Sequence, residues 1–335
     1  MSETTGFTQT IDWLAFTLPK AEVDEVIKTI GGDWFKSETG FRGYPTAQLM
    51  TQGKTGIGKL GTGAPRNPKE VHVDLSAGIV SQWDEPKLKE ILTWIFAQKG
   101  HVTRTDMAMD DREGTVTIET VRLAVEAGQV VSRSKQFKVI QASNHRDGVR
   151  TGETLYFGSR ASQTMLRVYD KRLELKRQGR EDAETYGVRW ELEFKQDRAQ
   201  ACAKALLTLD AEDWRAYLVG VLRSYIDFRE TTREAESYEK YRAPLLPWWE
   251  ALTEGFKRCR LVVERLQRRL DDVAAWLAQT IAPMLAVVVT CRGDQFVTEL
   301  IAAGKKKWTQ KHQALLTQRK VGTPYVLHLK PRPSP

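Results

Sequence analysis

The chain has 335 residues, of which 41% are hydrophobic and 28% are charged, so it has the composition of a globular protein and is long enough for two compact units. Its formal charge of +8 favours an acidic partner, and nucleic acid is the commonest such partner for a protein of this size. The three scattered cysteines include no CxxC pair, which argues against a zinc site. With no signal-peptide pattern and no uninterrupted apolar span, we expect a cytoplasmic protein without a membrane segment.

The first 200 residues predict the same order of elements twice. A strand at 8–17, a helix at 21–30, strands near 42–51, 55–61 and 70–75 and a helix at 85–98 are followed by a strand at 102–110, a helix at 117–127 and strands near 136–142, 154–159, 165–171 and 188–195. Residues 10–16 also resemble residues 104–110, at an offset of 94. The predicted fold class is α+β, with two similar β-α-β-β-β halves (about 8–98 and 101–198) that form curved antiparallel sheets with helices on one side.

The remainder is expected to be mostly helical, with helices at 199–208 and 211–227 and a boundary near Pro244 and Pro247. Residues 253–280 have an apolar stripe and an arginine-rich opposite face, and residues 254–320 contain 13 Lys or Arg against 6 Asp or Glu. We therefore interpret 8–198 as a catalytic domain, 199–320 as a basic region for DNA binding, dimerisation or both, and 321–335 as a disordered tail. The candidate DNA-binding residues are Arg104 and Arg160 in the catalytic domain and Arg265, Arg268, Arg269, Lys305, Lys306, Lys307 and Lys311 in the basic region.

One strand carries a tyrosine between two cations. In the predicted strand 165–171 the period of two places Arg167, Tyr169 and Lys171 on one face. Such cations would lower the pKa of the phenol and neutralise a phosphate under attack, which suits a nucleophile; the alternative is a surface tyrosine on a solvated strand. Tyr156, on the preceding strand with Arg160 on the same face, is the competing nucleophile.

Carboxylates are predicted to lie on the polar faces of nearby strands. Asp106 and Asp110 share one face with Arg104 in line, and Glu191 and Glu193 share another. If these strands neighbour 165–171, the carboxylates could hold Mg²⁺ or Mn²⁺ through oxygen ligands; the alternative is a set of ordinary outward charges.

Several common signatures are missing. The sequence has no GxSxG and no HExxH, and none of its five histidines forms a His-hydrophobic-His pair. The stretch GKTGIGKL from Gly53 approaches a phosphate-binding loop, but Leu60 stands where a hydroxyl residue is required, so we do not interpret it as one.

Three blocks together resemble the Rep-trans replication initiation factor family, which comprises rolling-circle initiators of small plasmids and filamentous phages and related relaxases of conjugative elements. These blocks are TRTDMAMDD (103–111), TLYFGSRASQTMLRVYDKRLE (154–174) and RWELEFK (189–195). The stretches TIDWLAFT (10–17) and VHVDLSAG (71–78) are similar to its N-terminal pattern. The resemblance extends, in separated blocks, over roughly residues 8–250.

The resemblance implies an endonuclease and ligase that nicks one strand of a supercoiled origin, forms a 5′-phosphotyrosine and leaves a free 3′-OH. It also implies a divalent metal, later strand closure, and cooperation with a host helicase and DNA polymerase. Tyr169 would be the nucleophile and Lys171 and Arg167 the phosphate-side cations, with Asp106, Asp110, Glu191 and Glu193 as metal ligands. The alternatives are a conjugative relaxase and a non-catalytic origin-binding regulatory protein of the same fold.

Overall fold

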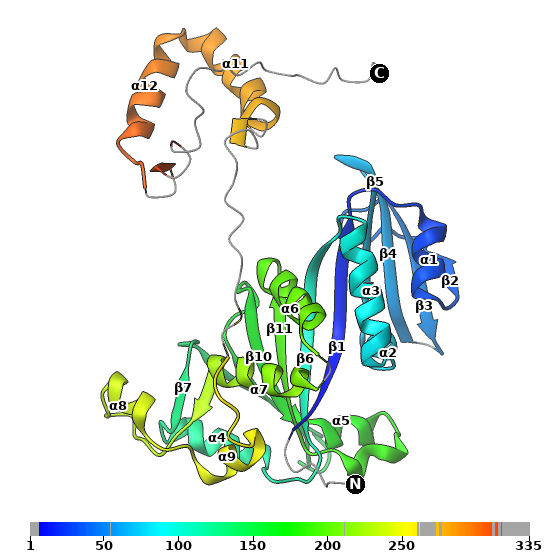
Figure 1. Cartoon of the computed structure of the whole chain (residues 1–335), viewed down its shortest axis with the longest axis vertical. Coiled ribbons are helices and arrows are strands. Elements are labelled where there is room, and N and C mark those ends of the chain that lie inside the picture. Colours follow the sequence, from blue (N-terminus) through cyan, green and yellow to red (C-terminus); the bar gives the residue numbers. More distant parts are fainter. Residues whose placement is uncertain are drawn as a thin grey trace. The chain divides into compact units, whose positions relative to one another are not determined.

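The computed structural model describes residues 7–53, 55–210, 212–259, 261, 273–274, 277–309, 312–313 and 316 (Figure 1). The chain divides into two compact units, Met1–Glu264 and Arg265–Pro335. The candidate DNA-binding residues Arg265, Arg268, Arg269 and Lys311 and the predicted tail lie outside the described residues.

The first unit is built on one ten-stranded antiparallel sheet, which confirms the predicted α+β class with antiparallel strands. Its strand order is β2-β3-β4-β5-β1-β6-β11-β10-β9-β8, so each half of the chain supplies five strands and the halves meet at β1 and β6. The strands are β1 (Phe7–Leu18), β2 (Trp34–Lys36), β3 (Thr46–Gln52), β4 (Thr55–Ala64), β5 (Asn67–Leu75), β6 (His101–Asp111), β8 (Phe137–Ser143), β9 (Arg150–Phe157), β10 (Thr164–Asp170) and β11 (Val188–Lys195).

Helices cover one face of this sheet because alternate strand residues are apolar. Phe16, Val73, Leu166 and Leu192 are fully buried and join helix residues such as Ile91 in one core. The helices of this unit are α1 (Val23–Ile30), α2 (Ala77–Val80), α3 (Glu85–Ala97), α4 (Ile118–Glu126), α5 (Lys171–Arg177), η1 (Glu181–Thr185), α6 (Asp197–Thr208), α7 (Asp213–Tyr225), α8 (Ser237–Arg242) and α9 (Pro247–Thr253). None of the helices in the described ranges is long and apolar enough to cross a bilayer.

The opposite face of the sheet is polar, and neighbouring strands hold it in register. In this register Asp106 on β6 lies opposite Glu193 on β11. Arg167 on β10 lies between Glu191 on β11 and Tyr156 on β9. The convergence of polar strand faces proposed from the sequence is therefore present. A β-bulge between Ile11 and Trp13 inserts Asp12 as an extra residue in β1, which shifts the register by one.

The segment from residue 199 to residue 261 is part of the first unit. Trp249 on α9 is fully buried against Trp190 of β11, with ring centroids 4.9 Å apart, and its indole nitrogen donates to Asp227 at 2.8 Å. The buried Asp227 also accepts hydrogen bonds from Arg223, at 3.0 Å, and from Arg258, at 2.8 Å. The boundaries expected at residue 198 and near Pro247 consequently fall inside one compact unit.

Three local predictions need correction. Lys171 begins helix α5 rather than ending the strand, because Asp170 caps that helix by accepting from the Leu173 backbone N–H. The helix expected from Thr253 does not begin there, since α9 ends at Thr253 and residues 256–259 are not helical. The short strands β2, β7 (Val130–Ser132) and β12 (Ile226–Phe228), of which β7 and β12 pair with each other, were not predicted.

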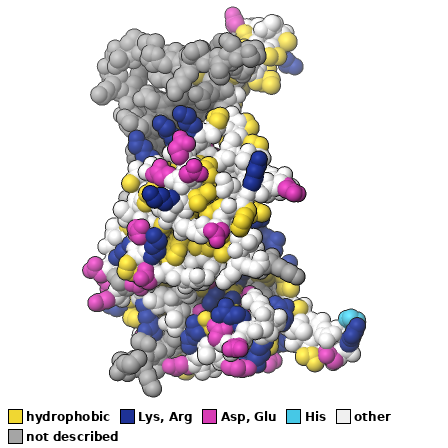
Figure 2. Space-filling model, turned by 90° about the vertical axis from the view of Figure 1, so that its right-hand side faces the viewer, with side chains coloured by type: hydrophobic (Ala, Val, Ile, Leu, Met, Phe, Trp, Pro, Cys, Tyr) yellow, Lys and Arg dark blue, Asp and Glu magenta, His cyan; other side chains and the backbone are white. Residues whose placement is uncertain are grey.

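The described part of the second unit is helical, with η2 (Leu277–Ile281), α11 (Ala282–Arg292) and α12 (Gln295–Lys305). Lys305, Lys306 and Lys307 are exposed at the end of α12. On the face of the molecule in Figure 2, basic and acidic side chains are interspersed rather than gathered into one wide patch of a single sign.

Candidate active site

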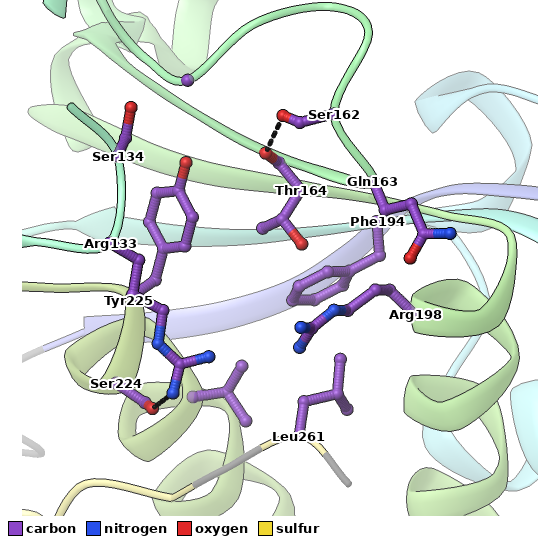
Figure 3. A pocket seen from close by; sticks show the side chains of 12 residues that line it. Arg133, Ser134, Ser162, Gln163, Thr164, Phe194, Arg198, Ser224, Tyr225 and Leu261 are labelled. Atoms are coloured by element: carbon purple, nitrogen blue, oxygen red, sulfur yellow. Dashed lines mark hydrogen bonds between the residues drawn. The ribbon is translucent and has the colours of Figure 1, made fainter. Parts of the chain in front are cut away.

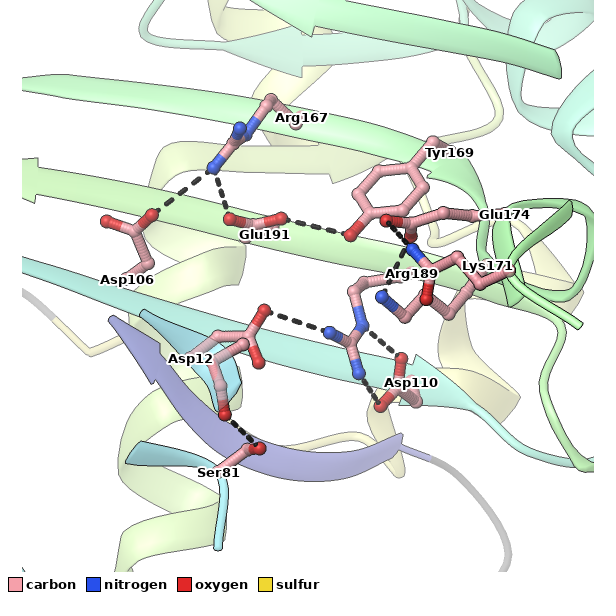
Figure 4. Close-up of polar contacts among 12 residues, drawn as sticks. Asp12, Ser81, Asp106, Asp110, Arg167, Tyr169, Lys171, Glu174, Arg189 and Glu191 are labelled. Carbon is pink, nitrogen blue, oxygen red and sulfur yellow. Dashed lines mark hydrogen bonds and ion pairs between the residues drawn. The ribbon is translucent and has the colours of Figure 1, made fainter. Parts of the chain in front are cut away.

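The polar face carries a linked set of ion pairs at the centre of the C-terminal half-sheet (Figure 4). The buried Asp106 accepts two hydrogen bonds from Arg104, at 2.9 and 2.6 Å, and one from Arg167 at 3.2 Å. Arg167 also contacts Glu191 on the adjacent strand. A period-two strand pattern places these side chains on one face, which is why the sequence predicted their proximity.

Tyr169 lies next to this set and points to Glu191. Its phenol donates to Glu191 Oε2 at 3.2 Å. Burial, followed by the charge of Glu191, raises the pKa of the Tyr169 phenol well above its ordinary value, and Arg189 opposes this shift. The expectation that flanking cations lower this pKa was therefore wrong, because Arg167 is paired with two carboxylates and a carboxylate, not a cation, contacts the phenol.

The two carboxylates beside Tyr169 and Arg167 also have perturbed acidities. Burial raises the pKa of Glu191 to about 7, although the neighbouring Arg167 acts to lower it. Burial likewise raises the pKa of Asp106 despite its hydrogen bonds from Arg104. A carboxylate with a pKa near neutrality, in contact with a phenol, can take up the phenolic proton when an ester is attacked.

Arg189 and Asp12 belong to this site and were not predicted from the sequence. Arg189 donates to both oxygens of Asp110, at 2.6 and 2.7 Å, and to Asp12 at 3.0 Å, and all three side chains are buried. The signal for Arg189 was available, because it precedes Glu191 by two residues in the same strand and must share its face. Asp12 could not be assigned in this way, since the β-bulge that brings it to Arg189 has no sequence pattern of its own.

The other predicted cations have local partners. Lys171 pairs with Glu174 at 2.8 Å, and its ammonium lies 5.9 Å from the centroid of the Tyr169 ring, so it stays beside the tyrosine although it has left the strand. Arg104 stacks over Trp13, at 4.2 Å from the ring centroid, and pairs with Glu193 at 3.0 Å. Arg104 is therefore a packed member of the ion-pair set rather than a free surface cation.

The competing nucleophile is placed differently from Tyr169. Tyr156 lies opposite Arg167 on β9, on the same polar face. Within the described ranges its hydroxyl has no hydrogen-bond partner, whereas that of Tyr169 has Glu191. Arg160, which was expected on the same face as Tyr156 at the start of the turn that follows its strand, lies in the turn after β9, where its carbonyl accepts from Lys195.

The predicted metal ligands do not form a metal site in this arrangement. Asp106 and Asp110 each accept from an arginine through both oxygens, and Glu193 is paired with Arg104 and with Lys195, at 2.6 Å. Although burial acts to raise it, Lys195 and Arg104 hold the pKa of Glu193 below its usual range. Across the described residues, no three His, Cys, Asp or Glu side chains are grouped so that they could hold a metal ion.

A separate cavity of about 410 Å³ lies on the helix-covered side of the sheet (Figure 3). It is lined by Thr164 and Phe194 from the strands, by Arg198 on α6 and by Tyr225 on α7. These strand positions alternate with Arg167, Tyr169 and Glu191, so the cavity opens on the opposite face from the ion-pair set. It contains none of the residues predicted for catalysis.

Known proteins with similar sequences and folds were found by three comparisons. A solved structure, described as a rolling circle replication initiator protein from Geobacillus stearothermophilus, is similar in fold at a TM-score of 0.62, with 22% identity, 77% of this chain covered and 100% of that chain. A Bacillus subtilis (strain 168) protein that carries the name DNA relaxase NicK is 23% identical over 328 residues, which cover 91% of this chain and 88% of the relative. The family model described as "Replication initiation factor" matches residues 100–302. Because that match covers more than half of the chain and includes the strands β6, β10 and β11, this chain belongs to the replication initiation factor family.

Proposed function

We propose that the chain nicks one strand of its replication or transfer origin through Tyr169 and later rejoins it. The observation that carries this proposal is the contact between the Tyr169 phenol and Glu191, on a strand face where Arg167 links Glu191 to Asp106. In this proposal Tyr169 is the nucleophile, Glu191 the proton acceptor and Arg167 a cation for the phosphate, all within one partly buried set. A family of relaxases and rolling-circle initiators supports the same reaction class.

In the proposed reaction the phenolic oxygen attacks the scissile phosphorus. The tyrosine O–P bond forms as the bond from phosphorus to the 3′-oxygen breaks, which gives a 5′-phosphotyrosine and a 3′-OH. The phenolic proton passes to Glu191, the leaving 3′-oxygen takes a proton from water, and the hydroxide so formed takes the proton from Glu191, so that no net proton is gained or lost. Arg167 and Lys171 would neutralise the phosphoryl oxygens as charge develops. Rejoining is the reverse reaction, with the 3′-OH attacking the phosphotyrosine. A host helicase and DNA polymerase would act on the nicked strand.

Nicking of supercoiled DNA tests the tyrosine assignment. The substrate is a supercoiled plasmid that carries the chain's own gene with its flanking DNA, incubated with the full chain and Mg²⁺ or Mn²⁺. We expect Tyr169→Phe to abolish both the nick and covalent attachment to DNA, and Tyr156→Phe to retain both. Attachment by Tyr169→Phe together with its loss in Tyr156→Phe would transfer the role to Tyr156.

The same assay separates the enzyme from a non-catalytic origin-binding protein. A regulatory protein would bind the plasmid with strong salt dependence and leave it supercoiled with either metal. Conversion to open circles with a tyrosine-linked 5′ end is the outcome expected of a nicking enzyme. Mapping the nick to a replication origin or to a transfer origin would distinguish an initiator from a conjugative relaxase.

A further inference from the structure

The two halves of the sheet can be compared position by position, starting from Trp13 on β1 and Asp106 on β6, which lie opposite each other where the halves meet. Two residues further along each strand are Ala15 and Ala108. From Ala108, the C-terminal half-sheet continues sideways through Glu191, Arg167 and Tyr156. From Ala15, the N-terminal half-sheet continues sideways through Asp74, Lys59 and Leu49. The N-terminal row thus repeats the order alanine, carboxylate, cation.

The residue that corresponds to the nucleophile is a glycine. Two residues after Arg167 on β10 is Tyr169, which lies opposite Arg189. Two residues after Lys59 on β4 is Gly61, which lies opposite His72. The ring of Tyr44 lies over Gly61, because a Cβ added to Gly61 would be 2.8 Å from Tyr44 Cγ. Tyr44 itself donates to Glu70 at 2.6 Å, and burial followed by this hydrogen bond raises the pKa of its phenol. This half therefore keeps the charges but has a glycine at the strand position that corresponds to Tyr169, and the tyrosine ring over it comes from another segment.

Cations and an aromatic ring remain accessible at this corresponding site. Lys59 is exposed and has no ion-pair partner among the residues described, and its ammonium lies 5.5 Å from the Phe41 ring centroid. Arg42 is 53% exposed, pairs with Asp74 at 2.7 Å and lies 5.4 Å from the same centroid. A two-residue turn fixes this arrangement, since Phe41 and Tyr44 exchange backbone hydrogen bonds while the φ angles of Arg42 and Gly43 are 49° and 87°.

The row ends on a second aromatic residue. Phe35 on β2 lies opposite Leu49 and is 59% exposed at the edge strand of the sheet. Phe35 is exposed, and Phe41 is half-buried and stacks on His72 with ring centroids 5.9 Å apart. Cations interleaved with accessible aromatic rings suit single-stranded nucleic acid, because phosphates contact the cations and bases stack on the rings. A duplex would offer only its phosphates to such a surface, since its bases are already stacked.

We propose that Arg42, Lys59, Phe41 and Phe35 form a second, non-cleaving site for single-stranded DNA on the same polar face as Tyr169. The cations would contact phosphates and the rings would stack against bases, so that the strand is held away from the residues that cut it. This inference rests on the proposed nicking function in one respect, namely that the C-terminal half-sheet binds the same DNA strand. Lys59 is the residue to substitute, because its contact is with the Phe41 ring and the substitution breaks no ion pair among the residues described.

Binding of the full chain to a fluorescent 20-nucleotide oligo-dT tests this site. We expect Lys59→Ala to weaken binding about three- to tenfold at low salt and to reduce the slope of log affinity against log salt by about 0.7, the value for one lost phosphate contact on a single strand. Lys59→Arg should retain affinity within about twofold because it keeps the charge. The matched control is Lys28→Ala, an exposed lysine on helix α1, which should behave as the parent chain.

Nicking of the supercoiled plasmid distinguishes this site from the catalytic one. Lys59→Ala should raise the DNA concentration needed for half-maximal covalent attachment and leave the maximal yield intact. If Lys59→Ala matched Lys28→Ala in affinity and salt slope, or if it abolished attachment at saturating DNA, the non-cleaving site would be overturned. Nicking by Tyr169→Phe would instead contradict the proposed function and leave the oligo-dT result standing.

Discussion

Tyr169 and Glu191 are diagonal neighbours on adjacent antiparallel strands, with the phenolic oxygen 3.2 Å from Glu191 Oε2. The phenol is harder to ionise than a free tyrosine because burial and Glu191 raise its pKa. In the proposed reaction an adjacent proton acceptor would therefore matter more for attack on phosphorus than cations around the ring. The same contact means that the protonation state of Glu191 should control the rate.

The first prediction concerns Glu191 as this proton acceptor. Because the pKa of Glu191 is raised to about 7, the nicking rate of the parent chain should rise with pH through neutrality as the carboxylate ionises. Glu191→Gln should lower the rate by about 10²- to 10⁴-fold, the range for loss of a general base, and remove this rise. Single-turnover attachment to DNA from pH 5.5 to 8.5 measures both. A full-rate Glu191→Gln with the parent pH profile would exclude this role.

The second prediction concerns the buried pair of Arg189 and Asp110. Asp110→Ala leaves the buried Arg189 with Asp12 alone and should cost about 3–5 kcal/mol in the free energy of unfolding, as for other broken buried pairs. The control is Asp182→Ala, which removes the partner of Arg180 at similar distances, 2.9 and 2.6 Å, at an exposed position and should change stability by less than about 1 kcal/mol. Urea unfolding of both variants makes the comparison, and equal effects would contradict it.

The third prediction concerns a metal requirement. The family resemblance implies that EDTA abolishes nicking and that Mg²⁺ or Mn²⁺ restores it. The carboxylates of the polar face are already paired with arginine or lysine, so metal should bind weakly to the free chain and leave its unfolding midpoint unchanged. Thermal unfolding, measured with and without either metal at about 5 mM, tests whether the unfolding midpoint stays unchanged. Nicking that persists in EDTA would assign the charge neutralisation to Arg167 and Lys171 without a metal.

The fourth prediction concerns His72, which is buried and stacks against Tyr44 with ring centroids 5.7 Å apart. Burial lowers the pKa of His72 below its usual 6.5, so the folded state holds it neutral while the unfolded state takes up a proton as pH falls. The free energy of unfolding should therefore decrease as the pH falls below about 6.5, the pKa of histidine in the unfolded chain. His72→Gln should lose less stability than the parent chain between pH 7.5 and pH 5, as measured by urea unfolding. A greater loss in the variant would refute this.

Much of the sheet could be predicted because its strands alternate apolar and polar residues. That pattern placed Arg167 and Tyr169 on the polar face of one strand, and Asp106 and Glu191 on the polar faces of two others, before the order of the strands was known. It could not locate Lys171 correctly, because Asp170 caps a helix that begins where the alternation seems to continue. It also could not show which carboxylates are already paired, since Arg189 and Arg104 reach their partners across strands whose order is set by tertiary packing.

The C-terminal part of the first unit was the least predictable portion. Its charged stretch and its prolines are typical of a linker, and composition alone favours a boundary there. The structure instead buries Trp249 against Trp190 and surrounds Asp227 with arginines that lie as far along the chain as Arg258. Long-range pairs of this kind leave no local pattern, because each partner taken singly is an ordinary charged or aromatic residue.

The contact between Trp249 and Trp190 limits how this protein can be recombined with its relatives. A junction between residues 199 and 248 would take Trp190 and Trp249 from different parents, and one between residues 227 and 257 would separate Asp227 from Arg258. Chimaeras intended to transfer origin preference should therefore be joined after Leu261, where the whole tryptophan core comes from one parent. A hybrid joined earlier would be expected to fail in folding before its DNA preference could be measured.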